Sequence, residues 1–203
     1  MKDPKNVYST FRRGFQPFVG SLAKWGVTPN MVTAAGIGLN LAATPLIALG
    51  HFWWAAAIFV AASICDLLDG SLARFSGKES AFGAFLDSTM DRVSEGVTLI
   101  ALGVYYARTD HLPELVAVFI FLMASYLVSY ERARAEALGL DCKVGLMSRP
   151  ERIIVLTTGF VFAQWYVLSV AVYLLAVLTT FTVLQRILHV RRQLLREEGV
   201  RPG

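Results

Sequence analysis

The stretch "CDLLDGSLARFSGKESAFGAFLDSTMD", residues 65–91, places four aspartates in an otherwise apolar part of the chain. Asp66 and Asp69 are three residues apart, and Asp87 and Asp91 are four residues apart. Residues at these spacings lie on one face of a helix. A short polar turn separates the two pairs, so we expect two antiparallel neighbouring helices. Their carboxylates would then meet at a similar depth in the molecule.

The composition of the 203-residue chain is that of a membrane protein. Hydrophobic residues make up 55% of it and charged residues 17%, whereas soluble domains carry about 25% charged residues. Because one membrane-crossing helix needs about 20 apolar residues, the chain has room for several. We therefore expect an all-α, polytopic membrane protein with a single domain over residues 1–203. The net charge of +4 favours anionic headgroups or phosphorylated substrates, and we expect no nucleic-acid partner.

The apolar segments predict six transmembrane helices, preceded by an N-terminal amphipathic helix and followed by a polar tail. Aromatic and basic residues alternate over 7–25, which is typical of a helix lying in the membrane interface; a cytoplasmic helix packed on the bundle is the alternative. Pro29 and Asn30 signal the start of the first span, and Gln164 with Trp165 marks a turn within a long apolar run. The bundle extends over 31–188 and the tail over 189–203. The expected spans are 31–50, 52–74, 81–107, 114–138, 151–164 and 166–188.

Six spans place both termini and the loop over 139–150 on one side of the membrane. Of the 19 lysines and arginines, only Arg108 falls in the loops of the opposite side. Basic residues concentrate on the cytoplasmic side of membrane proteins. The sequence thus predicts a protein integral to the cell (plasma) membrane, with both termini and the aspartates at the cytoplasmic face.

The four aspartates indicate bound cations. Like charges repel strongly in a low-dielectric setting, and each is costly to bury alone. Arg74 and Arg92 can neutralise part of this charge, and divalent ions such as Mg²⁺, Mn²⁺ or Ca²⁺ prefer carboxylate oxygens. A site with two such ions near basic residues is typical of phosphoryl transfer, in which a spare carboxylate takes the proton of an attacking hydroxyl. The alternative is a proton or cation pathway in a carrier.

Two glycines share the faces of the aspartates. Gly70 and Gly83 leave space for a large ligand such as a nucleotide, although close helix packing also favours glycine. Together these residues resemble the signature of the CDP-alcohol phosphotransferase family. The match covers eight fixed positions: Asp66-x2-Asp69-Gly70-x2-Ala73-Arg74-x8-Gly83-x3-Asp87-x3-Asp91.

This resemblance implies an enzyme that displaces CMP from a CDP-linked lipid, CDP-diacylglycerol or an archaeal counterpart, with the hydroxyl of a second alcohol. It implies two ions, Mg²⁺ or Mn²⁺, with Asp66, Asp69 and Asp87 as principal ligands and Asp91 close to the metals as general base. It also implies a homodimer. The implied nucleotide-binding residues are Pro29, Asn30, Thr33, Gly70, Ala73, Arg74 and Gly83.

The acceptor alcohol is indicated by the stretches 86–96, 129–140 and 149–154, which resemble a branch of this family, the phosphatidylinositol phosphate synthases, that uses inositol 1-phosphate. Glu131-Arg132 departs from that branch, where an apolar residue and a lysine stand. Arginine binds phosphate through two parallel hydrogen bonds. The expected acceptor-binding residues are Ser129, Arg132, Arg149, Arg152 and Arg186. Glycerol 3-phosphate is the alternative acceptor, and for Glu95 we expect an ion pair.

Overall fold

A computed structural model of the protein describes residues 20–200, apart from 22–23 and 77–79. From residue 29 onward, the described part of the chain contains six α-helices, one short 3-10 helix and no strand. The all-helical fold is therefore as expected, whereas the amphipathic helix expected over 7–25 lies largely outside the described residues. The helices are α2 (Pro29–Ala48), α3 (Phe52–Ser76), α4 (Ala81–Arg108), α5 (Leu112–Ala137), α6 (Arg149–Val161) and α7 (Val167–Val200), with η1 (Ala163–Trp165) between the last two.

Hydroxyl side chains cap two of the helices, α2 and α4. The Thr28 Oγ1 atom accepts a hydrogen bond from the Met31 amide, so Thr28 caps α2. The sequence had instead suggested Asn30 for this position. Pro29 fits the first helical position because it has no amide hydrogen to leave unpaired. Ser80 caps α4 in the same way, since its Oγ atom accepts from the Gly83 amide at 3.0 Å.

The contacts between the six helices close into a ring. In order, α3 packs on α2, α2 on α4, α4 on α5, α5 on α7, α7 on α6, and α6 returns to α3. The expected direct packing of the two aspartate helices is therefore wrong, because α2 lies between α3 and α4. Gly36 of α2 permits this close approach: a Cβ atom there would lie 3.1 Å from the Cβ atom of Cys65 in α3.

Four helices, α2, α3, α5 and α7, are long and apolar enough to cross a membrane. Four of the five charged residues of α4 lie in its first fifteen residues, Asp87, Asp91, Arg92 and Glu95, and the fifth, Arg108, ends the helix. With 13 residues, α6 is about 20 Å long, shorter than the bilayer core of about 30 Å.

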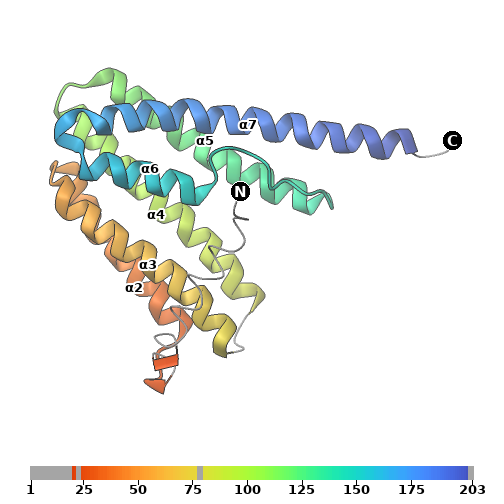
Figure 1. The fold of residues 1–203 in the computed structure, drawn as a ribbon, viewed down its shortest axis with the longest axis horizontal. Coiled ribbons are helices and arrows are strands. Elements are labelled where there is room, and N and C mark those ends of the chain that lie inside the picture. Colours follow the sequence, from red (N-terminus) through yellow and green to blue (C-terminus); the bar gives the residue numbers. More distant parts are fainter. Residues whose placement is uncertain (1–19, 22–23, 77–79, 201–203) are drawn as a thin grey trace, which may run out of the picture.

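The second half of the chain follows the expected turns, with shifted limits. The turn expected at Gln164 is present as η1, after which Tyr166 adopts a left-handed conformation with φ of 61°. The helix α6 begins at Arg149, two residues before the expected start of the fifth span, and α7 continues to Val200, beyond the expected end of the sixth span at 188. In Figure 1, α7 extends past the other helices toward the C-terminus.

Candidate active site

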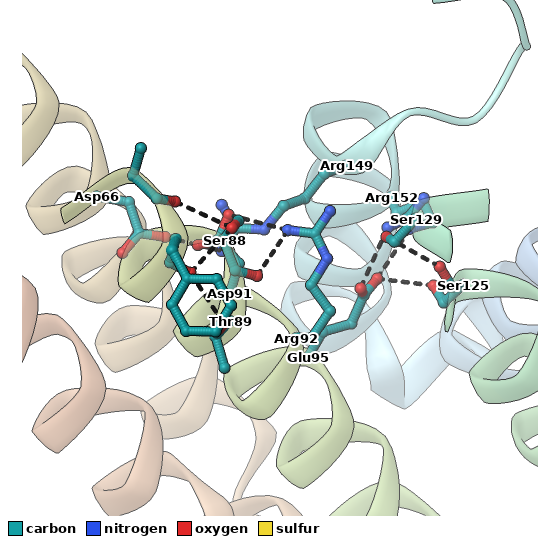
Figure 2. A network of polar contacts seen from close by, with 12 residues as sticks. Asp66, Ser88, Thr89, Asp91, Arg92, Glu95, Ser125, Ser129, Arg149 and Arg152 are labelled. Carbon is teal, nitrogen blue, oxygen red and sulfur yellow. Dashed lines mark hydrogen bonds and ion pairs between the residues drawn. The ribbon is translucent and has the colours of Figure 1, made fainter. Parts of the chain in front are cut away.

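One arginine joins the two aspartate helices (Figure 2). The Nη2 atom of Arg149, in the first turn of α6, lies 2.9 Å from Oδ2 of Asp66 in α3 and 2.7 Å from Oδ1 of Asp91 in α4. Three helices of the ring thus meet at a single guanidinium group. The sequence suggested Arg74 and Arg92 as the cations that neutralise the aspartates. In the structure, Arg149 makes the shorter contacts with Asp66 and Asp91. Arg92 lies 3.6 Å from Asp91 and donates to the Ser88 carbonyl.

A second ion pair, between Arg152 and Glu95, lies beside the first and deeper in the ring. Nε of Arg152 donates to Oε1 of Glu95 at 2.8 Å, and its Nη2 donates to Oε2 at 3.1 Å. The hydroxyl of Ser125 in α5 also donates to Oε1 of Glu95, and Nη1 of Arg152 donates to the Met147 carbonyl. Only 2% of the Arg152 side chain is exposed. The expected ion pair of Glu95 is therefore present, and it fixes α6 against α4 and α5.

The other two aspartates complete the acidic cluster. The Thr33 hydroxyl in α2 donates to Oδ2 of the buried Asp69 at 2.6 Å. Asp87 lies close enough to Asp66, Asp69 and Asp91 for their charges to interact. The charges of the four carboxylates, here called the aspartate cluster, thus interact as expected, although α2 lies between the two helices that carry them. Within the described ranges, no three acidic, histidine or cysteine side chains already surround a point where a metal ion could sit.

A cavity of about 490 Å³ opens next to this cluster. A volume of this size is typical of a ligand site. Asp69 and Asp87 lie in its wall, together with the capping residue Ser80. All seven residues expected to contact a nucleotide line it: Pro29, Asn30, Thr33, Gly70, Ala73, Arg74 and Gly83.

Glycine keeps this cavity open at two points. A Cβ atom at Gly70 would meet only the guanidinium of Arg74, 3.6 Å away. At Gly83, a Cβ atom would lie 3.0 Å from the Oγ atom of Ser80, which caps the helix. Both glycines border a ligand-sized space and not a neighbouring helix, which favours the ligand interpretation over close helix packing.

The five residues expected to bind the acceptor are dispersed. Arg149 contacts the aspartate cluster, Arg152 is closed off by Glu95, and Ser129 donates to the Ser125 carbonyl at 3.2 Å. Arg132 is half-exposed and pairs with Glu136, one helical turn away. Arg186 of α7 is buried. Its Nε donates to the Val144 carbonyl at 3.0 Å and its Nη1 to the Val128 carbonyl.

Two contacts of the site were not foreseen from the sequence, the bridge from Arg149 to both aspartate helices and the bond from Ser125 to Glu95. The first has a signal in retrospect. Asp91 and Glu95 are one turn apart on α4, and Arg149 and Arg152 are about one turn apart on α6, so the charges match in pairs. Ser125 carries no such signal, because an isolated serine in an apolar helix has no distinguishing pattern.

Comparisons with known proteins identify the family of the chain. Residues 26–184 match the model of the CDP-alcohol phosphatidyltransferase family. The chain is 36% identical to the phosphatidylinositol phosphate synthase of Mycolicibacterium smegmatis, over 92% of this chain and 89% of that protein. It is 33% identical to the archaetidylinositol phosphate synthase of Methanothermobacter thermautotrophicus, over 94% of this chain and 97% of that protein.

The fold also resembles solved structures. The crystal structure of Mycobacterium tuberculosis phosphatidylinositol phosphate synthase with CDP-DAG bound superposes with a TM-score of 0.81 at 35% identity. The match covers 86% of this chain and 92% of that one. A second structure of that protein, in complex with manganese and citrate, gives a TM-score of 0.80. The aspartates alone left a carrier open as an alternative, and these matches decide in favour of an enzyme. The chain belongs to the CDP-alcohol phosphatidyltransferase family.

Proposed function

We propose that this protein transfers a phosphatidyl or archaetidyl group from a CDP-linked lipid to inositol 1-phosphate and releases CMP. The observation that carries this proposal is the cavity of about 490 Å³, in which the seven expected nucleotide residues meet Asp69 and Asp87. Arg149 contacts the two remaining aspartates, Asp66 and Asp91. The relatives with the corresponding names support inositol 1-phosphate over glycerol 3-phosphate as the acceptor.

The donor set of the site fits two divalent cations, Mg²⁺ or Mn²⁺. Asp66, Asp69, Asp87 and Asp91 would hold them, and such ions neutralise phosphate oxygens when bound. The guanidinium between Asp66 and Asp91 supports this assignment, because a cationic group already fits between these two carboxylates. The manganese complex of the similar mycobacterial enzyme supports it too.

The chain's own residues account for the remaining steps. Arg74, in the wall of the cavity, pairs with the diphosphate of the CDP-linked lipid, while Gly70 and Gly83 admit the nucleotide. Asp91 accepts the proton of the acceptor hydroxyl. The hydroxyl oxygen then attacks the phosphorus atom that carries the lipid. The bond from that phosphorus to the CMP oxygen breaks, and CMP leaves.

The acceptor phosphate needs fixed cationic donors, and the proposed set is Ser129, Arg132, Arg149, Arg152 and Arg186. Within this set Arg149 is nearest to the reacting groups, since it touches Asp91 itself. Arg152 and Arg186 are buried behind it. They support the acceptor site by holding the start of α6 and the loop before it.

The membrane arrangement is part of the same proposal. The six helices cross the bilayer with both termini and the aspartates on the cytoplasmic side, in the cell membrane. Two copies form a homodimer. The concentration of lysines and arginines on one side of the expected spans supports this orientation.

An acceptor panel tests the reaction. The purified protein is incubated with CDP-diacylglycerol, Mg²⁺ and one of four acceptors: inositol 1-phosphate, inositol, glycerol 3-phosphate or serine. We expect CMP release and a new phospholipid with inositol 1-phosphate, and a loss of at least about 100-fold in rate for Asp91→Asn. A product with glycerol 3-phosphate and none with inositol 1-phosphate would show that the acceptor is wrong.

A further inference from the structure

We propose that Arg149 is an exchangeable counterion of the aspartate cluster: it holds Asp66 and Asp91 together until divalent cations bind, and is then released. One nitrogen atom, Nη2, contacts carboxylate oxygens of both residues, at 2.9 and 2.7 Å. No other arginine or lysine of the described residues forms ion pairs with two of the four aspartates.

Arginine and metal need the same oxygen atoms. A divalent cation shared by Asp66 and Asp91 would bind the carboxylate oxygens that now accept from Arg149. The guanidinium group and the cation also repel each other, and this repulsion is strong where little water screens it. Loading the cation therefore requires that Arg149 leaves these two oxygens.

Arg152 anchors the start of α6, so Arg149 can leave the two carboxylates without a movement of the helix. Arg152, one turn further along, is fully buried and held by Glu95, Ser125 and the Met147 carbonyl. In contrast, 25% of the Arg149 side chain is exposed. Among the described residues, its guanidinium has no hydrogen-bond or ion-pair partner besides Asp66 and Asp91. Figure 2 shows the two pairs side by side, with Arg149 on the side of Asp66 and Asp91. The anchored pair thus keeps a mobile side chain within reach of the site.

The released guanidinium would have a second partner, the phosphate of the acceptor; this step rests on the proposed function. Arginine binds phosphate through two parallel hydrogen bonds. A phosphate that draws Arg149 away from the aspartates makes metal binding easier. By thermodynamic linkage, the metal then strengthens phosphate binding by the same factor. Arg149 would in this way couple the loading of the metals to the arrival of the acceptor.

The test measures Mn²⁺ affinity directly, by electron paramagnetic resonance of free Mn²⁺ with the full-length protein in detergent and no CDP-linked lipid present. We expect Arg149→Gln to bind Mn²⁺ at least about tenfold more tightly than the original protein, because a competing cation with short charged contacts is gone. Arg149→Lys should fall between the two, since an ammonium group lacks the fork of an arginine.

Arg92→Gln is the matched control, because it also removes one positive charge near Asp91, at 3.6 Å. We expect its Mn²⁺ affinity to change by less than about threefold. Equal tightening in both glutamine variants would reduce the effect to net charge and overturn the proposal. Unchanged or weaker binding in Arg149→Gln and Arg149→Lys would overturn it as well. Should Arg149→Gln not yield folded protein, Arg149→Lys decides alone.

A second arm tests the link to the acceptor. Addition of inositol 1-phosphate should tighten Mn²⁺ binding by the original protein more than by Arg149→Gln. Equal tightening in both proteins would disprove the link through Arg149 and leave the exchange itself standing. Neither arm contains the lipid substrate. A failure of the proposed reaction would therefore appear in the acceptor panel, and a failure of the exchange would appear in the Mn²⁺ affinities.

Discussion

At the scale of single residues, Thr33 has two roles in one position. The sequence placed it near the nucleotide, and it does line the cavity. Its hydroxyl also donates to Oδ2 of Asp69 at 2.6 Å, which orients that carboxylate toward the cluster. A hydrogen bond to a charged group contributes about 1.5–3 kcal/mol. Spacing along the chain could not reveal this contact, because the two residues belong to different helices.

The substitution Thr33→Val removes the hydroxyl and keeps the shape of the side chain. We expect kcat/KM for the CDP-linked lipid to fall about tenfold or more, because Asp69 loses its partner and turns more freely. Thr33→Ser is the control and should retain most of the activity. Steady-state CMP release measures both variants, and equal activity of the valine and serine variants would refute the role of the hydroxyl.

The residues of the site could be predicted from the sequence to different extents. The family resemblance predicted seven of the residues that line the cavity: Gly70, Ala73, Arg74 and Gly83 from the motif, and Pro29, Asn30 and Thr33 from the stretch before the first span. It did not predict that Arg149 would bridge Asp66 and Asp91. That contact depends on how α6 docks, and a contact between distant helices leaves no periodic pattern in either one.

At the scale of helices, the contact between α6 and α7 depends on one glycine. A Cβ atom at Gly159 would lie 3.0 Å from the Cβ atom of Ala171 and 3.4 Å from the Cα atom of Leu168. These neighbours belong to α7 and one of the atoms is backbone, so they cannot turn aside. The helix α6 can therefore lie flat against α7 only because residue 159 has no side chain.

We expect Gly159→Ala to lower the stability of the protein by about 1–3 kcal/mol, the usual cost of overpacking a close contact. The melting temperature in detergent should fall by about 2–10 °C. Gly38→Ala in α2 is the matched control, because a Cβ atom there meets nothing within 4 Å. Fluorescence-detected unfolding compares the two variants, and an equal melting temperature in both would contradict the packing argument.

The loop over 138–148 is tied to α7 before it reaches α6. The Thr182 hydroxyl accepts a hydrogen bond from the Met147 amide at 3.1 Å, and Arg186 binds the Val144 carbonyl. A Cβ atom at Gly145 would clash with the Cγ2 atom of Thr182, so the loop lies directly on the helix. These contacts determine where α6 starts.

Thr182→Val should therefore destabilise the protein although it changes little in volume. The Met147 amide would lose its partner in a buried place, at a cost of about 1–3 kcal/mol. Thr182→Ser keeps the hydroxyl and should stay within about 1 kcal/mol of the original protein. Thermal unfolding again reports the difference, and a valine variant as stable as the serine variant would rule out the amide contact as a source of stability.

At the scale of the whole molecule, the sequence predicted the helices better than their arrangement. Apolar length and the turn residues predicted six helices and the break at Gln164, within a few residues of the observed limits except at the C-terminal end of α7, which lies at Val200 and not at 188. The order around the ring was not accessible in this way. Two helices joined by a short turn were expected to pack together, but Gly36 and the buried Ala43 let α2 fit between them.

The orientation in the membrane gives a prediction for the whole molecule. In a background without the native thiols, Cys65→Ser and Cys142→Ser, single cysteines are introduced at Leu112 and at Arg192, both of which are exposed. We expect a membrane-impermeant maleimide to label Leu112→Cys in intact cells and to label Arg192→Cys only after the cells are opened. Labelling of Arg192→Cys from outside would reverse the proposed topology.

The order of the helices along the chain has a consequence for biosynthesis. The acidic helices α3 and α4 leave the ribosome before α6, which carries Arg149 and Arg152. Until α6 arrives, the nascent chain must keep four carboxylates at the membrane without these two partners. That state is costly in lipid, so it will be short-lived or shielded by the insertion machinery. A transcript that stops after α5 should accordingly yield a chain that quality-control proteases remove, although most of its apolar length is already in place.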